Sequence, residues 1–193
     1  HGRVSPAMSI RLLKALEPYY PLFVEEPVLP ENVDEMVRVS RSTTIPIAAG
    51  ERLFTKFGFR ELIEKQAVSV VQPDLCHCGG IFEARKIAAM AETYYMQIAP
   101  HNPLGPISLA ACMQLDACVP NLLAQEHPGM PDHADLGVGI LKTPFKIEDG
   151  YICIPEGPGL GIEVDEDQLD ALRFDGTWDT PHLEFEDGSI ADW

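Results

Sequence analysis

Acidic and basic side chains stand at the ends of short apolar runs in this chain. Glu25 follows Leu-Phe-Val, Glu51 follows Pro-Ile-Ala-Ala-Gly, and His101 follows Gln-Ile-Ala-Pro. Asp74 and Glu126 hold equivalent places, after Val-Val-Gln-Pro and Leu-Leu-Ala-Gln. Each run is typical of a buried strand, and the carboxyl ends of parallel strands meet at the edge where a (β/α) barrel carries its chemistry. We therefore expect these five side chains to share one site.

This arrangement suggests removal of a proton next to a carboxylate. Glu25 and Glu51 could share a divalent cation, and hard oxygen ligands suit Mg²⁺. Asp74 could fix the tautomer of His101 and raise its basicity. The metal would then stabilise an enediolate while the histidine takes the α-proton. Taken singly, the pair Glu25-Glu26 is typical of a solvated loop, Asp74 of a turn, and His101 of a structural position.

The elements that must position these groups alternate between helix and strand from residue 5 to about residue 126. The predicted strands are Leu22–Glu25, Ile45–Ala49, Val68–Gln72, Gln97–Ala99 and Leu122–Gln125. The first predicted helix begins at Ser5-Pro6 and ends at Pro18, and the others are Asn32–Arg41, Phe57–Lys65, Ile81–Tyr95 and Ile107–Cys118. Strands separated by helices imply right-handed βαβ units and a parallel sheet.

Five such strands are too few for a closed barrel of eight, which takes about 250 residues. The sequence therefore predicts either an open doubly wound sheet or a barrel whose front part is missing. An open nucleotide-binding sheet is disfavoured because no G-x-G-x-x-G loop occurs. Residues 127–139 are typical of a loop, residues 144–164 of short β-runs, and residues 165–172 of a short helix. We expect residues 1–143 to form a partial barrel and residues 144–193 to form a β-rich segment and tail that packs back on it.

The composition argues against several other classes of protein. A formal net charge of −16 disfavours a nucleic-acid partner, because phosphate binding needs a basic surface. No apolar run approaches 18 residues and no signal peptide is evident, so no membrane span is predicted. Of the five cysteines, Cys76 and Cys78 lack the Cys-x-x-Cys spacing of structural zinc sites. We interpret the cysteines as reduced and structural, in a cytoplasmic protein.

Several stretches of the sequence resemble one known family. They are VEEPV (24–28), AAGER (48–52), QPDLCHCGGI (72–81), APHNPLGPISLAA (99–111) and QE (125–126), with HGRVS at the start. Their order and spacing resemble the mandelate racemase/muconate lactonizing branch of the enolase superfamily, nearest its D-galactonate dehydratase-like members. The resemblance runs from His1 to about Gly161. It implies an α/β fold, namely the C-terminal part of a (β/α)₇β TIM-like barrel.

The resemblance also implies separate catalytic roles. His101 would take the α-proton with Asp74 beside it, and Glu126 would hydrogen-bond the substrate carboxylate or the enediolate. His1 matches a general acid that protonates the departing 3-hydroxyl. Base and acid would then lie on opposite faces of the substrate, which suits anti elimination of water to a 2-keto-3-deoxy acid. Asn102, next to the proposed base, could add a polar contact.

The same resemblance implies Mg²⁺ as cofactor, with Glu25 and Glu51 matching the second and third metal ligands. The first ligand would lie two residues before His1, so it is absent, as are the first strands and the N-terminal capping domain. We therefore expect the chain alone to be inactive. Its full-length parent is expected to be a cytoplasmic, homo-oligomeric sugar-acid dehydratase, with a small-molecule substrate and no nucleic-acid or membrane partner.

Two rival functions remain open on the sequence. A racemase or epimerase on the same scaffold needs bases on both faces, and His1 could serve as the second base. Alternatively, the chain could be an inactive truncated remnant that binds a sugar acid or is purely structural. The residues Cys76-His77-Cys78 lie near the mouth of the site or are structural. His127 and His133 border the pocket or lie on the surface, and Arg52 contacts a substrate carboxylate or pairs with the last strand-end glutamate.

Overall fold

The computed structural model describes residues 2–173, 176 and 183–190. Its centre is a parallel sheet of four short strands in the order β1-β2-β3-β4. They are β1 (Val24–Glu25), β2 (Ile47–Ala49), β3 (Val70–Val71) and β4 (Gln97–Ile98). A parallel bridge from Ile98 to Leu122 extends the sheet by one further pairing. Neighbouring strands are thus consecutive in the sequence, as simple βαβ repetition requires.

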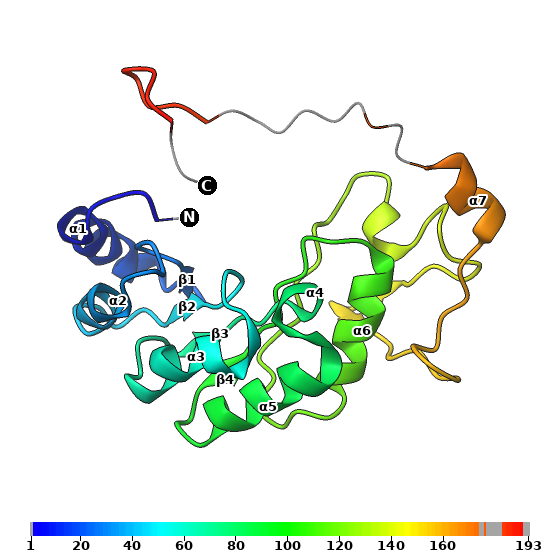
Figure 1. Cartoon of the computed structure of the whole chain (residues 1–193), viewed down its shortest axis with the longest axis horizontal. Coiled ribbons are helices and arrows are strands. Elements are labelled where there is room, and N and C mark those ends of the chain that lie inside the picture. The colour runs from blue at the N-terminus through cyan, green and yellow to red at the C-terminus, as the bar shows by residue number, and fades with distance from the viewer. Residues whose placement is uncertain (1, 174–175, 177–182, 191–193) are drawn as a thin grey trace.

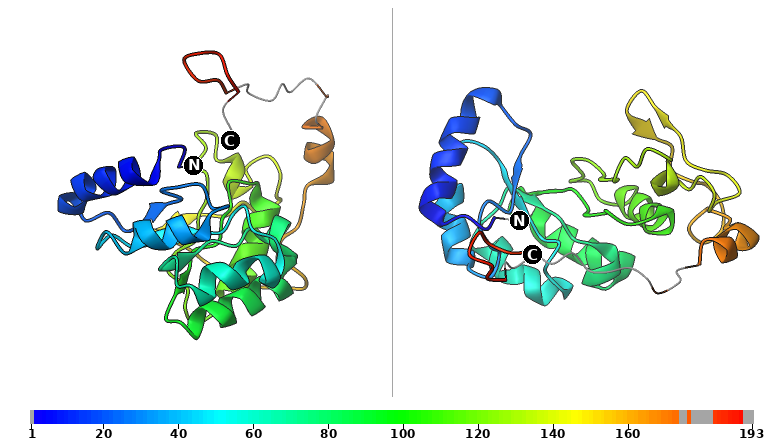
Figure 2. Two further views of the ribbon diagram at one scale, coloured as in Figure 1. Left: turned by 60° about the vertical axis from the view of Figure 1, so that its left-hand side comes forward. Right: turned by 90° about the horizontal axis from the view of Figure 1, so that it is seen from above.

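Helices connect the strands and cover one side of the sheet. They are α1 (Pro6–Leu16), η1 (Glu17–Tyr19), α2 (Val33–Ser40), α3 (Thr55–Glu64), α4 (Leu75–Cys78), α5 (Gly80–Glu92) and α6 (Pro106–Asp116). Figure 1 shows α1, α2, α3, α5 and α6 in an arc outside the strands, and the views in Figure 2 show the same open curve. The parallel α/β fold predicted from the sequence is confirmed.

The helices begin where local side chains satisfy their first backbone N–H groups. Ser5 accepts a hydrogen bond from Met8 N at the start of α1, and Asn32 accepts one from Glu35 N at the start of α2. Such caps satisfy donors that have no partner within the helix. The prediction that Pro18 ends the first helix needs correction, because the chain continues from α1 into the 3₁₀ turn η1 around it.

The sheet buries both of its faces, and different residues line each one. Ile47, Ala49, Val71 and Ile98 belong to the main core with the helices, alongside Phe59 and Ile87, which are fully buried. Ala48, Val70 and Ala99 form a separate cluster on the opposite face, packed by Phe23 and Leu123. Because side chains alternate along a strand, Glu25, which pairs with Ala48, belongs to this second face.

The predicted strands are longer than the observed ones. Each of the first four predicted runs contains a strand of two or three residues, whereas Leu122–Gln125 contributes only the bridge at Leu122. Backbone hydrogen bonds from Ile98 N to Asn121 O and from Leu123 N to Ile98 O still dock this segment on β4. The apolar runs therefore predict where each strand lies, but they overestimate the length of the strand.

The segment after the sheet packs against α6. The turn η2 (Ala134–Leu136) joins Leu109 and Met113 of α6 in a small core, and Phe145 and Ile152 pack on it. A hairpin follows, from β5 (Ile147–Glu148) to β6 (Tyr151–Ile152), and then α7 (Glu166–Ala171). The division at residues 143 and 144 remains a prediction, and most of the expected extended tail lies outside the described residues.

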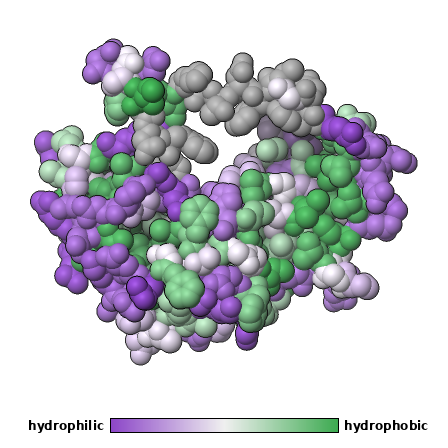
Figure 3. All heavy atoms as spheres, in the orientation of Figure 1, coloured by the Kyte–Doolittle hydropathy of each residue, from purple (hydrophilic) through white to green (hydrophobic). Residues whose placement is uncertain are grey.

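The surface differs between the two ends of the molecule. Figure 3 shows apolar side chains gathered over α6 and the segment that follows it, and a largely hydrophilic surface over α1 and α2. Exposed apolar residues of that segment include Ile147, Tyr151 and Ile154. Within the described ranges, no helix combines the length and the apolar character needed to cross a bilayer.

Gly50 allows β2 and β3 to end close together, and its replacement should destabilise the chain. Its φ is +150°, and a Cβ there would lie 2.8 Å from Gln72 N and O. We expect Gly50→Ala to lower the free energy of unfolding by about 1–3 kcal/mol, measured by urea denaturation. Gly58→Ala, inside α3 with no atom nearer than 3.8 Å, is the matched control and should not destabilise. Equal stability of both variants would contradict this reading of Gly50.

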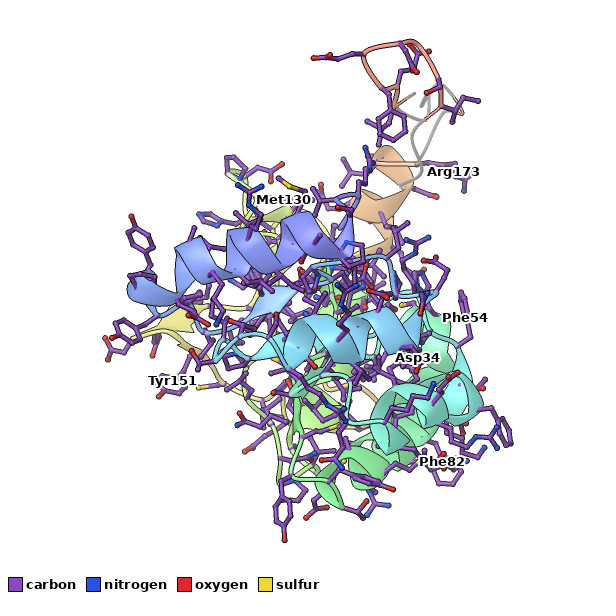
Figure 4. All side chains as sticks on the ribbon, turned by 90° about the vertical axis from the view of Figure 1, so that its left-hand side faces the viewer. Asp34, Phe54, Phe82, Met130, Tyr151 and Arg173 are labelled. Carbon is purple, nitrogen blue, oxygen red and sulfur yellow. The ribbon has the colours of Figure 1, made fainter. Side chains whose placement is uncertain are left out.

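Asp135 organises the loop after Glu126, in which Figure 4 labels Met130. The buried carboxylate accepts hydrogen bonds from His127 Nδ1 at 2.7 Å, Gly129 N at 3.0 Å and Met130 N at 3.2 Å. Burial works to raise the pKa of Asp135, but these donors outweigh it and the pKa is lowered. The stabilisation is therefore complete above the unfolded pKa, about 3.9, and is lost as the pH falls through the folded value.

Asp135→Asn should accordingly lower the free energy of unfolding near neutral pH by about 1–3 kcal/mol, since hydrogen bonds to a charged acceptor are lost. The difference from the unmodified chain should shrink as the pH falls from 5 towards 2. Urea denaturation at several pH values measures both quantities. Asp132→Asn, at an exposed position of the same loop, serves as control. A difference that stays constant with pH would rule out the ionised carboxylate as the cause.

Candidate active site

The loops at the carboxyl ends of the four strands bring the predicted side chains together. Glu25 is the last residue of β1, and Glu51 follows β2 by two residues. Asp74 and His101 each lie three residues beyond their strands and are joined by a parallel backbone bridge. Because the strands are parallel and in consecutive order, all four positions fall at one edge of the sheet.

Close contacts between polar side chains link three strand ends. His101 Nδ1 lies 2.9 Å from Asp74 Oδ2, and His101 Nε2 lies 3.2 Å from Glu51 Oε2. The side chain of Asp74 is fully buried, and those of His101 and Glu51 are 13% and 14% exposed. Nδ1 of His101 is thus bound to a buried carboxylate, while Nε2 faces the carboxylate of Glu51.

Asp74 is held by the backbone as well as by the histidine. Its Oδ1 accepts hydrogen bonds from Cys76 N at 2.7 Å and His77 N at 3.2 Å, which caps α4. Burial favours a higher pKa for Asp74, but the hydrogen bond to His101 and the one from Cys76 N lower the pKa overall. The carboxylate therefore stays ionised and accepts a hydrogen bond from the Nδ1–H group of the histidine.

The environment of His101 raises its pKa. Burial alone would lower it, but the hydrogen bond to Asp74 and the negative charges of Glu51 and Glu126 outweigh that effect. An imidazole made more basic in this way, with Nδ1 bound to Asp74, presents Nε2 as the reactive nitrogen.

Glu25 and Glu51 are suited to holding a cation. Glu25 is open to solvent along part of its side chain, yet its pKa is raised, first by partial burial and then by the charges of Glu51 and Glu126. Gln72 opposes this by hydrogen bonding to Glu25. Mutual repulsion among hard oxygen donors is what a divalent cation relieves, so the donor set fits Mg²⁺. Within the described chain, no group of three or more His, Cys, Asp or Glu has the geometry of a complete metal site.

Asn102 positions the last strand-end glutamate. Its backbone N–H donates to Glu126 Oε2 at 2.7 Å, and its side chain lies 3.4 Å from the carbonyl oxygen of Glu126. Asn102 itself is completely buried. The expected polar contact of Asn102 is thus made with Glu126, which is exposed at the rim of the site.

Glu26 was not among the candidates from the sequence, where it belongs to an acidic pair typical of a solvated loop. It is 1% exposed, and its φ is +34°. Burial first, and the charge of Glu51 second, raise the pKa of Glu26 to about 7, against the opposing charge of Arg52. Arg52 Nη2 pairs with Glu31 Oε1 at 2.9 Å, rather than with Glu126, the partner considered from the sequence.

A cavity of about 700 Å³ opens beside these groups. Glu51, Asp74 and His101 line one part of it, and the rest is lined by Pro30, Glu31, Arg52, Leu53, Phe54, His77, Pro103 and Leu104. His77 comes from α4, a short helix that is not among the helices predicted from the sequence. Its capping aspartate, two residues before Cys76, is the only signal in the sequence that could have indicated the turn.

The remaining candidates from the sequence are the N-terminal histidine, the cysteines and the two histidines after Glu126. His1 lies outside the described residues, but Gly2 lies against the backbone of Glu26 to Val28, where a Cβ would come within 2.4 Å. All five cysteines are free thiols. Cys76 is exposed on α4, and its Sγ lies 3.5 Å from Ser108 Oγ of α6. His133 is exposed, and His127 is held by Asp135.

Relatives of known sequence match this chain from end to end. The D-galactonate dehydratase of Variovorax paradoxus (strain S110) is 47% identical over 199 residues, and that of Cronobacter sakazakii (strain ATCC BAA-894) is 48% identical over 200 residues. Both alignments cover 100% of the chain and 52% of the relative. The chain therefore spans about half the length of the curated relatives it matches.

Solved structures agree with these sequence matches. The mandelate racemase/muconate lactonizing enzyme-like protein from Roseovarius sp. TM1035 has a TM-score of 0.85 at 45% identity, covering 99% of this chain and 47% of that one. The mandelate racemase/muconate lactonizing enzyme from Sulfitobacter sp. has a TM-score of 0.84 at 45% identity, covering 92% and 44%. The arrangement is consistent with the C-terminal part of a TIM-like barrel. Since the family model for the enolase C-terminal domain-like proteins matches residues 1–168, this chain belongs to that family.

Proposed function

We propose that the full-length parent of this chain is a Mg²⁺-dependent dehydratase of sugar acids such as D-galactonate. The observation that carries this proposal is the buried Asp74–His101 pair, whose Nε2 lies 3.2 Å from the carboxylate of Glu51 at a neighbouring strand end. The relatives named D-galactonate dehydratase support a hydro-lyase of this substrate class. Cytoplasmic location and homo-oligomeric assembly of the parent remain expectations.

His101 would act as the base. Asp74 fixes the proton on Nδ1, so the lone pair of Nε2 points towards Glu51 and the cavity. A substrate whose α-carbon sits beside Nε2 would lose its α-proton to it. Burial of Asp74 keeps water from competing for the imidazole, and the ionised carboxylate stabilises the imidazolium that forms.

Glu25 and Glu51 would hold the cation, and a bound Mg²⁺ would supply charge stabilisation for the enediolate. Glu126, oriented by the backbone of Asn102, would contact the substrate carboxylate or the enediolate. His1 would protonate the departing 3-hydroxyl, a role that rests on the resemblance alone. A racemase would retain that hydroxyl, and product analysis distinguishes the two reactions.

Replacement of the base should abolish both proton removal and elimination. We expect His101→Asn in the parent to lower kcat for conversion of D-galactonate to the 2-keto-3-deoxy acid by about 10²–10⁴-fold, the usual worth of a general base. Incorporation of deuterium at the α-carbon from heavy water should fall in parallel. His133→Asn, at an exposed loop position, should retain both activities. Persistent α-exchange in the His101 variant would mean that another residue is the base.

The metal assignment can be tested without measuring turnover. Glu51→Gln in the parent should weaken Mg²⁺ binding at least tenfold, because one anionic oxygen ligand is lost. Glu64→Gln, exposed at the end of α3, should leave the dissociation constant unchanged. Isothermal titration calorimetry measures both. Similar affinities for the two variants would refute Glu51 as a ligand.

A further inference from the structure

We infer that His77 binds the substrate, through a hydroxyl on the part of the sugar acid beyond the reacting carbons. This inference rests on the proposed function and assigns that function a specificity-determining residue. His77 lines the same cavity as His101, and both imidazoles approach the same oxygen, Oδ2 of Asp74. One buried carboxylate therefore binds both the backbone N–H of His77 and the imidazole of His101.

The backbone of His77 is fixed by α4. Its N–H lies 3.2 Å from Asp74 Oδ1 and 3.1 Å from Asp74 O, within the first turn that Asp74 caps. A short helix that is capped by a buried carboxylate has little freedom to rotate relative to that carboxylate. The Cα of His77 is thus positioned by the same group that orients the proposed base.

The ring of His77 is held on two sides and open on a third. Its Nδ1 lies 3.7 Å from Asp74 Oδ2, too long for a hydrogen bond, and the ring of Phe54 packs on it with centroids 6.2 Å apart and planes tilted by 40°. Phe54 lies at the start of α3, at the margin of the molecule in Figure 4. The side chain of His77 is 47% exposed, and within the described chain no side chain is hydrogen-bonded to its ring nitrogens.

The other residues that line the cavity leave His77 as the imidazole available to bind a hydroxyl of the substrate. His101 already contacts both Glu51 and Asp74, and Arg52 pairs with Glu31. The remaining walls include the apolar side chains of Leu53, Phe54 and Leu104. Apolar walls suit the C–H faces of a polyhydroxylated chain, and a few placed polar groups then select its hydroxyls. His77 is the ring best placed to do this, because Nε2 is on the side away from Asp74.

A different role for His77 has a distinguishable consequence. If His77 only tuned the base through Asp74, its loss would slow proton removal from every substrate to the same extent. If it binds a distal hydroxyl, its loss would penalise only substrates that carry that hydroxyl. A comparison of long and short sugar acids therefore separates positioning of the base from recognition of the substrate.

The experiment compares D-galactonate, with six carbons, and a four-carbon aldonate of the same configuration at C2 and C3. In the parent with Mg²⁺, we expect His77→Ala to lower kcat/KM for the six-carbon acid about tenfold, the loss of one substrate hydrogen bond, and for the four-carbon acid less than twofold. His77→Gln, which can still hydrogen-bond, should recover most of the loss. Phe54→Leu should act in the same direction more weakly, and His133→Asn should leave the ratio unchanged.

Calorimetric binding of both acids is measured in parallel, so that slow turnover of the short acid still yields a ratio. Equal losses for both acids, or no loss for either, would overturn the assignment of His77. A parent that binds both acids but dehydrates neither would refute the proposed function instead, and the binding ratio would still decide the role of His77.

Discussion

The buried carboxylate of Asp74 is the constraint on which this edge of the molecule depends. It caps α4 and accepts a hydrogen bond from the imidazole of His101, while the backbone of the same residue forms a parallel bridge with His101 beyond the ends of β3 and β4. A fully buried charge is tolerated only where several donors meet it, and here two backbone N–H groups and one ring N–H do so. The local chain direction and the orientation of His101, the proposed base, are consequently set by one side chain.

The parallel sheet supplies the second condition, which is convergence. Consecutive strand order and a register without gaps place residues two or three positions past each strand at one edge. The close approach of Gly50 to Gln72 keeps the ends of β2 and β3 together. Carboxylates from separate strands are thereby brought near enough that, after burial, the charges of Glu51 and Glu126 raise the pKa of Glu25.

The parallel sheet and most of the candidate site could be predicted from the sequence. Buried parallel strands appear as continuous apolar runs, and a polar residue directly after such a run is easily recognised. The pairing of Asp74 with His101 was predicted in this way and is present. The helix α4 was missed since four residues carry no periodicity, and the burial of Glu26 was missed since its acidic neighbour suggests solvent. Asn102 was expected to contribute a polar contact, but its partner could not be foreseen, because the hydrogen bond uses its backbone N–H.

The loop that follows Glu126 is closed by contacts from within itself. Every donor to Asp135 comes from residues 127–130, and only Leu136 anchors the loop in the apolar cluster on α6. Because the hydrogen bonds to Asp135 all come from within the loop, they hold its conformation independently of the sheet. The outer residues of the loop can be exchanged for others without repacking the sheet, so this stretch can vary in sequence while the strand-end carboxylates stay in place.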